Sequence, residues 1–119
     1  MIEAPFDGEE AITLLADLDA GATGTMTSGM IVDQIKPVIT AYHAGHIDRA
    51  TQAYGRVAMV VNHENRQCGW QSCKAAMVVG GVIKSDFCRH PIPELHPDIK
   101  ARLMSLLNPL DPLVLRWGL

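Results

Sequence analysis

The opening thirty residues contain a strand–helix–strand pattern that constrains the fold of the whole chain. A short apolar start leads into a turn at Asp7-Gly8, a helical pattern follows, and residues 23–27 form a short β-branched run. Two strands joined by a helix are parallel, and a parallel unit buries its strands on both faces. We therefore expect these strands to need neighbouring strands, and almost no sequence precedes them.

Local signals predict where the first helix begins and ends. Asp7 is a suitable N-cap, and Glu10 follows three residues later, as in a capping arrangement. An apolar stripe at helical spacing runs from Ile12 to Leu18, and Gly21 is a typical stop signal. The pattern predicts one helix between Asp7 and Gly21.

The remainder of the chain has mainly helical periodicity. Apolar spacing predicts helices over 30–44, from Ile47 to about residue 61, over 69–79 and over 98–107. Pro37 predicts a kink or break in the first of these helices. Residues 62–66 are polar and indicate a connection, while three prolines make 89–97 extended or turn-like. A helical bundle would leave the opening strands without a role.

The totals exclude several classes of protein. A net charge of −3 gives no electrostatic basis for a nucleic-acid partner. Apolar runs stay well below the roughly 18 residues of a membrane span, and no signal-peptide pattern opens the chain. Three cysteines without framework spacing are typical of a reducing compartment. We expect a cytoplasmic protein.

Histidine and cysteine spacings give little support for a metal. His43, His46 and His63 have spacings at which zinc ligands occur, but no cysteine or carboxylate accompanies them at matching spacing. Cys68 and Cys73 are five apart, so they do not form a Cys-x-x-Cys pair. We predict no metal and no cofactor.

Several runs together resemble one enzyme family, the dihydrodipicolinate synthase / N-acetylneuraminate lyase family. The runs are Asp7-Gly8-Glu9-Glu10-Ala11-Ile12-Thr13-Leu14-Leu15, Ala20-Gly21-Ala22-Thr23-Gly24-Thr25-Met26-Thr27, Ala44-Gly45-His46-Ile47-Asp48-Arg49-Ala50, Cys73-Lys74-Ala75-Ala76-Met77 and Arg89-His90-Pro91. Residues 62–67 and 110–117 look most like its 2-keto-3-deoxy-L-arabinonate dehydratase branch.

The resemblance implies a fold as well as a chemistry. The family is built on a TIM (β/α)8 barrel, which typically needs about 250 residues. Residues 1–29 would be the end of strand seven, helix seven and strand eight, and residues 30–119 would be helix eight and a C-terminal helical extension. The predicted fold class is α/β, the C-terminal part of a barrel that is mostly α in isolation and forms one incomplete domain.

Full-length members of such a family would be class I, Schiff-base lyases. The resemblance implies a lysine on the sixth strand that condenses with the 2-keto group of a 2-keto-3-deoxy sugar acid, assisted by an upstream tyrosine. Both belong before Met1, and none of Lys36, Lys74, Lys84 and Lys100 is predicted at a strand end. We therefore predict no catalytic residue here, and a chain that is inactive alone.

Two strand ends remain as a candidate substrate site. Substrate contacts in a TIM barrel come from the C-terminal ends of strands, which here places Gly8 and Glu9 after strand seven and Met26 and Thr27 after strand eight. Glu9 can accept hydrogen bonds from a sugar hydroxyl, and Thr27 can donate or accept one. The alternatives are that Glu9 and Glu10 only serve a helix N-terminus and that Met26 only packs in the core.

An incomplete barrel also predicts self-association. Strands without neighbours expose backbone groups, and helix faces without a barrel expose apolar side chains. We expect a homo-oligomer or another self-associating state. The alternative function is a helical interaction module derived from the same family.

Overall fold

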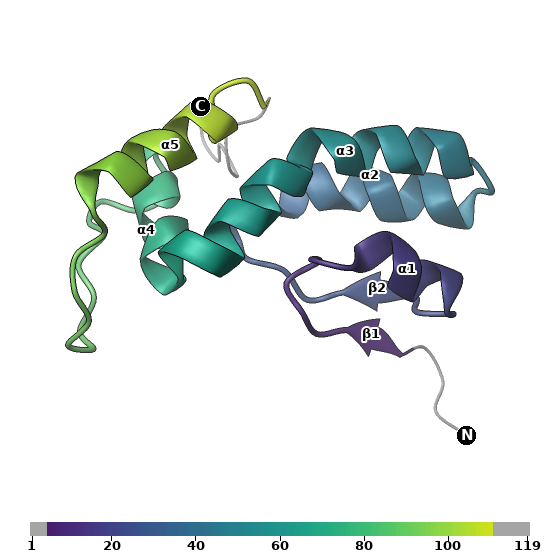
Figure 1. Ribbon diagram of the computed structural model, residues 1–119, viewed down its shortest axis with the longest axis horizontal. Helices are drawn as coiled ribbons and strands as arrows, with labels where there is room; N and C mark the ends of the chain where they lie inside the picture. The colour runs from purple at the N-terminus through teal and green to yellow at the C-terminus, as the bar shows by residue number, and fades with distance from the viewer. Residues whose placement is uncertain (1–4, 111–119) are drawn as a thin grey trace.

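The computed structural model describes residues 5–110 and begins with a parallel strand pair. β1 (Phe6–Asp7) pairs with β2 (Gly24–Thr25), so that Phe6 lies opposite Gly24 and Asp7 opposite Thr25. α1 (Leu14–Asp19) connects the two strands (Figure 1). The predicted strand–helix–strand unit is therefore present, although both strands are short. The strand end expected within residues 1–4 lies outside the described residues.

The start of α1 differs from the prediction. Asp7 belongs to β1 and does not cap the helix, whose N-cap position is Thr13. Between them Glu10 (φ 59°) and Ala11 (φ 66°) adopt left-handed backbone conformations, which are unfavourable for residues other than glycine. The segment after β1 is therefore a turn, and the capping arrangement of Asp7 with Glu10 is wrong. Gly21 (φ 103°) follows the end of α1, as expected.

Two long helices form an antiparallel pair. α2 (Val32–His43) and α3 (Ile47–His63) lie side by side and are joined by a turn at Gly45, whose φ of 83° favours glycine (Figure 1). Pro37 lies inside α2, and the helix continues through it, so the predicted break is absent.

The C-terminal end of α3 continues into a π-helical segment. η1 (Glu64–Cys68) replaces the polar connection that the sequence predicted at 62–66. The Asn65 side chain donates to the Val61 carbonyl at 2.9 Å, which supports the continuation. Gly69 (φ 67°) then ends this segment, and α4 (Trp70–Val79) begins in a new direction.

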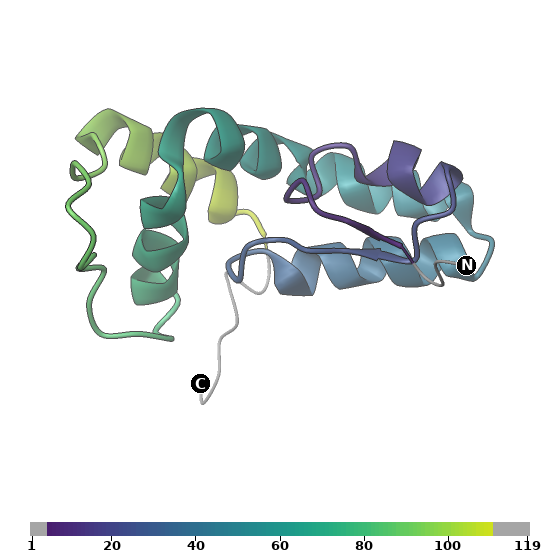
Figure 2. The same cartoon turned by 90° about the horizontal axis from the view of Figure 1, so that it is seen from below.

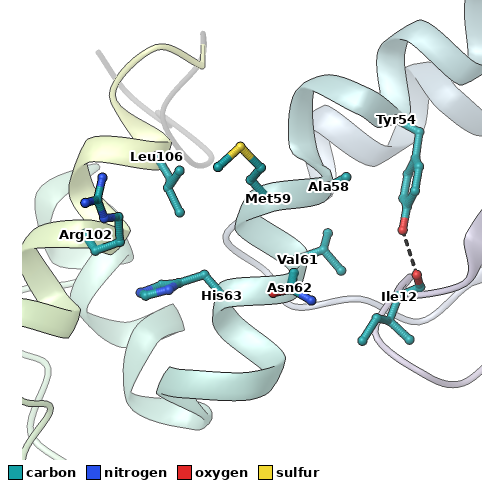
Figure 3. A pocket seen from close by; sticks show the side chains of 9 residues that line it. All are labelled: Ile12, Tyr54, Ala58, Met59, Val61, Asn62, His63, Arg102 and Leu106. Carbon is teal, nitrogen blue, oxygen red and sulfur yellow. Dashed lines mark hydrogen bonds between the residues drawn. The ribbon is translucent and has the colours of Figure 1, made fainter.

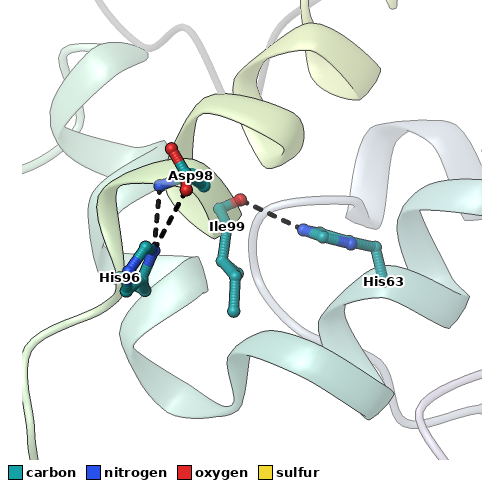
Figure 4. A network of polar contacts seen from close by, with 4 residues as sticks. All are labelled: His63, His96, Asp98 and Ile99. Carbon is teal, nitrogen blue, oxygen red and sulfur yellow. Dashed lines mark hydrogen bonds and ion pairs between the residues drawn. The ribbon is translucent and has the colours of Figure 1, made fainter.

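The last described helix is α5 (Pro97–Leu107), which follows a non-helical segment that contains Pro91 and Pro93. The third proline of the segment predicted to be extended, Pro97, is instead the first residue of the helix. Its first turn is capped by His96, whose Nδ1 accepts a hydrogen bond from the Asp98 N–H at 3.2 Å (Figure 4). His63 Nε2 donates to the Ile99 carbonyl at 3.1 Å and ties α5 to the end of α3.

One continuous core joins all five α-helices. α1, α2 and α3 lie at the same end of the molecule as the strand pair, while α4 and α5 lie at the far end of α3 (Figures 1 and 2). Tyr42 at the end of α2 donates to Asp19 Oδ1 at 2.7 Å, and His43 Nε2 donates to the Thr23 carbonyl at 3.0 Å. The largest fully buried apolar side chains are Leu14, Met30, Ile31, Val38, Val57, Val60, Val61, Leu103 and Leu107.

Candidate functional site

The predicted site residues gather where the two strands end. Because β1 and β2 are parallel, their carboxyl ends lie at the same edge of the sheet. A Cβ atom added at Gly8 would lie 3.4 Å from Met26 Cε, and the Met26 N–H donates to the Asp7 carbonyl at 2.9 Å. The structure thus brings the residues after β1 into contact with those after β2.

A buried carboxylate connects the two strands at this edge. Asp7 is 7% exposed, and its Oδ2 accepts a hydrogen bond from the Thr25 hydroxyl at 2.7 Å. Its Oδ1 accepts from the Glu9 N–H at 2.9 Å, which shapes the turn that contains Gly8 and Glu9. The sequence analysis assigned Asp7 to a helix cap. The positions of Asp7 and Thr25 at the ends of two expected strands could have predicted the hydrogen bond between them.

Glu9 and Glu10 lie on the exposed turn between β1 and α1. The helix begins at Leu14 and has Asp17 as the acidic residue of its first turn. The alternative that both glutamates only serve the helix N-terminus is therefore wrong, because neither lies in that turn.

The residues after β2 differ in their exposure. Met26 is 63% exposed, so the alternative that it only packs in the core is wrong for the described part of the chain. Thr27 Oγ1 and Ser28 Oγ are buried and have no hydrogen-bond partner among the described residues. Buried hydroxyls without partners are uncommon in folded proteins and indicate a site that another polar group completes.

A small pocket of about 360 Å³ opens beside these hydroxyls. Residues from the turn after β1, the loop after β2, η1 and α4 line it together: Glu10, Ser28, Glu64, Asn65, Gly69, Trp70 and Cys73. Sequence reasoning missed Glu64, which it placed in an exposed connection. The polar run 62–66 contains no local signal that one of its side chains is buried.

Glu64 is the buried acid of this pocket. It is 5% exposed, and its Oε2 has no hydrogen-bond partner among the described residues. Burial raises the pKa of Glu64 to about 7; the nearby Ser28 hydroxyl lowers this pKa and the Glu10 carboxylate raises it. Near neutral pH the side chain therefore exists in both protonated and ionised forms.

The cysteines near the pocket are poor nucleophiles. Burial raises the pKa of the Cys68 thiol to about 11, and the Glu64 charge contributes to this shift. Burial also raises the pKa of the Cys73 thiol. Since the thiolate is the reactive form, neither group is suited to nucleophilic chemistry at neutral pH. All three cysteines are free.

Lysines lie away from the strand ends. Lys74 Nζ donates to the Phe87 carbonyl at 2.8 Å, and Lys100 forms an ion pair with Asp86 at 3.7 Å. Lys36 lies in α2, and Lys84 lies in the segment after α4. Within residues 5–110, then, no amine that could form a Schiff base follows β1 or β2.

In the described part of the chain, no three histidine, cysteine, aspartate or glutamate side chains gather closely enough to hold a metal ion. Of the helices described, none combines the length and apolar character needed to cross a membrane.

A larger cavity of about 560 Å³ lies between α3, α5 and the turn before α1 (Figure 3). Tyr54, His63 and Arg102 are its main polar side chains, and the Tyr54 hydroxyl donates to the Ala11 carbonyl at 2.7 Å. None of the four predicted site residues lines this cavity or the smaller pocket. The smaller pocket is lined by Glu10 and Ser28, which directly follow Glu9 and Thr27 in the chain. The strand ends and the smaller pocket beside them therefore form the candidate site.

Comparison with known families accounts for this arrangement. The sequence pattern of the family described as "Dihydrodipicolinate synthetase family" matches residues 4–110. The chain belongs to the dihydrodipicolinate synthetase family. The resemblance inferred from the sequence runs is thereby confirmed.

One relative in this family is the L-2-keto-3-deoxyarabonate dehydratase of Azospirillum brasilense. The two sequences are 56% identical over 117 residues, which is 98% of this chain and 38% of the relative. The crystal structure of dihydrodipicolinate synthase from Rhodopseudomonas palustris matches with a TM-score of 0.83 at 22% identity. That match covers 90% of this chain and 36% of the synthase, so the fold corresponds to part of the synthase structure.

Proposed function

We propose that this chain is the C-terminal portion of a Schiff-base-forming lyase that acts on 2-keto-3-deoxy sugar acids, of dehydratase or aldolase type. The observation that supports this most directly is the 56% identity to the Azospirillum brasilense dehydratase over 98% of the chain. The chain spans 38% of that relative, so the activity belongs to the proposal for the whole protein.

In the proposed enzyme, β1 and β2 are the last two strands of a TIM barrel and α2 is the helix that follows strand eight. α3 to α5 form the helical extension. Gly8, Glu9, Met26 and Thr27 then contact the substrate at the C-terminal ends of the strands. The contact between Gly8 and Met26 and the exposed carboxylate of Glu9 support this assignment.

The chemistry needs a lysine, and no lysine lies at a strand end within residues 5–110. In a Schiff-base lyase, the lysine amine and the 2-keto group of the substrate lose water to form an iminium ion, which accepts electrons from the adjacent carbon. Dehydration of a 2-keto-3-deoxy sugar acid then removes a hydroxyl group as water. We infer that the chain positions the substrate hydroxyls and does not catalyse the reaction alone.

Borohydride trapping tests both parts of the proposal. The 119-residue chain, incubated with pyruvate or a 2-keto-3-deoxy sugar acid and then with borohydride, is expected to gain no mass. If the coding DNA continues upstream in the same frame, the longer protein is expected to be labelled at a lysine before Met1. Labelling of the 119-residue chain would overturn the inference of inactivity, and an unlabelled longer protein would overturn the lyase assignment.

A second candidate is a helical interaction module that associates with itself or with full-length relatives. Large apolar side chains on the surface favour it: Phe6, Met59, Trp70 and Phe87 are between 61% and 76% exposed. We further propose a cytoplasmic protein, supported by its three free cysteines. Size-exclusion chromatography tests the association, and a monomer at all concentrations would argue against it.

A further inference from the structure

The buried carboxyl of Glu64 lies where the helical extension meets the loop after β2. We propose that Glu64 is a positioning residue: its neutral carboxyl holds the loop 27–30 in place, and its ionisation releases that loop. The proposal concerns this chain alone and does not depend on the lyase activity.

Glu64 lies in an environment that disfavours its ionised form. The residue begins η1 and is 5% exposed, with Oε2 buried and unpartnered in the described structure. A buried carboxylate without a cation or several donors is strongly disfavoured relative to the neutral acid. The neutral acid also has an O–H group, which can donate to a neighbouring oxygen.

The loop after β2 offers the acid a polar partner. Thr27 Oγ1 and Ser28 Oγ are both buried and have no hydrogen-bond partner within residues 5–110. The Ser28 side chain lines the same pocket as Glu64. The Ser28 hydroxyl is close enough to Glu64 to lower its pKa, so a small rotation of this hydroxyl or an ordered water can join the two side chains. Thr27 precedes Ser28 in the same loop.

The loop also packs closely against α4. A Cβ atom added at Gly29 would lie 2.6 Å from Met77 Cε and 3.9 Å from Cys73 Sγ, both in α4. The next residue, Met30, is 1% exposed. The loop is therefore held between η1 and α4, and Glu64 is the titratable group at this contact.

The charges that face Glu64 do not stabilise its ionised form. Glu10 faces it from the turn after β1, Cys68 from η1 and Cys73 from α4. The remaining residues that line the pocket are uncharged, and no arginine or lysine is among them. An ionised Glu64 would meet the negative charge of Glu10 and two protonated thiols, so the packed arrangement favours the neutral acid.

The cost of burying an ionised Glu64 is reduced only if the carboxylate gains access to water. The carboxylate becomes hydrated when η1 and the loop separate, and separation exposes Thr27 and Ser28. Thr27 is one of the residues expected at the substrate site. The helical extension would thus control a candidate substrate loop as the pH crosses neutrality.

Amide exchange and NMR titration of the 119-residue chain test this coupling. Between pH 5.5 and 8.5, the amide signals of residues 27–30 are expected to titrate with the same midpoint as the Glu64 carboxyl carbon. Their exchange, normalised to the α2–α3 turn at Gly45, is expected to accelerate about tenfold above that midpoint. Loop signals that do not follow the Glu64 midpoint would overturn the proposal.

Three variants separate positioning from mere packing. Glu64→Gln keeps the shape and the donor, so the loop is expected to stay protected at every pH; a transition that persists in it would overturn the proposal. Glu94→Gln, which alters an exposed glutamate, should leave the transition unchanged. Ser28→Ala should raise the midpoint, because the hydroxyl favours the carboxylate. This last result decides the question if Glu64→Gln does not fold, since an unchanged midpoint would contradict the coupling.

Discussion

Asp7 is the residue that joins the two strand ends. Its carboxylate is almost fully buried and accepts hydrogen bonds from the Thr25 hydroxyl and the Glu9 N–H. Hydrogen bonds to charged groups contribute about 1.5–3 kcal/mol each, and a buried partner left alone costs about as much. The two hydrogen bonds that Asp7 accepts therefore determine where the turn with Gly8 and Glu9 lies relative to β2.

A double-mutant cycle on Asp7 and Thr25 tests this role of Asp7. Asp7→Ala is expected to lower the free energy of unfolding by about 2–3 kcal/mol, and Thr25→Val by about 1–2 kcal/mol. The double variant should cost less than the sum, because both changes remove the same hydrogen bond. Urea unfolding measures the three values, and Thr25→Ser, which keeps the hydroxyl, is the control. Strict additivity would show that the two side chains do not interact.

The titration of Glu64 predicts how stability depends on pH. Its pKa rises from an ordinary value of 4.5 to about 7 on folding. A raised pKa means that the folded state keeps the proton up to a higher pH than the unfolded state does. The contribution of Glu64 to the free energy of unfolding is therefore fully present below about pH 4.5 and is lost as the pH rises through 7. A pKa raised from 4.5 to about 7 corresponds to about 3 kcal/mol of stability.

Glu64→Gln isolates this contribution from the other carboxylates. The free energy of unfolding of the variant relative to the wild type is expected to increase by about 3 kcal/mol between pH 4.5 and 8. Chemical unfolding at a series of pH values measures it. A constant difference across this range would show that Glu64 titrates normally in the folded state.

At the scale of elements, the helices were predictable where their signals are local. Apolar spacing predicted α2, α3, α4 and α5, and Gly21 was correctly predicted to follow the end of α1. The start of α1 was not predictable, because Glu10 and Ala11 adopt left-handed conformations that a sequence normally signals with glycine. A hydroxyl from a distant helix supports them: Tyr54 donates to the carbonyls of Ala11 and Ile12.

The candidate site also has one part with local sequence signals and one part that depends on distant residues. Gly8, Glu9, Met26 and Thr27 could be placed together from the sequence, because parallel strands bring their carboxyl ends to one edge. Glu64 could not be placed there, since its burial requires α3 to continue as a π-helical segment into η1. The strand ends are thus encoded locally, whereas the pocket beside them depends on how the helical extension folds back.

Tyr54→Phe tests the long-range support of the turn before α1. Removing the hydroxyl leaves the Ala11 and Ile12 carbonyls without this donor, which is expected to cost about 1–2 kcal/mol of unfolding free energy. Amide exchange should increase within residues 9–13. The matched control is Tyr42→Phe, whose hydroxyl bonds to the exposed Asp19 and should matter by less than about 0.5 kcal/mol. Equal effects of the two variants would contradict a specific role for Tyr54.

For the whole molecule, the main consequence is the surface around the strand pair. Within residues 5–110 the sheet consists of β1 and β2 alone, and Phe6 is 61% exposed. The chain spans 38% of its dehydratase relative and 36% of the synthase of known structure, both of which are longer proteins. Open strand edges and exposed aromatic side chains promote pairing with other chains.

Self-association through the strands is therefore the expected solution behaviour. Light scattering coupled to size-exclusion chromatography should show an average mass that rises with protein concentration. Phe6→Lys places a charge on β1 and should shift the chain toward the monomer, because edge lysines oppose strand pairing. Phe87→Lys makes the same change at a side chain that is 74% exposed but lies in the segment between α4 and α5. If both variants reduce association equally, the contact does not involve the strands, and the exposed face of the helical extension becomes the better explanation.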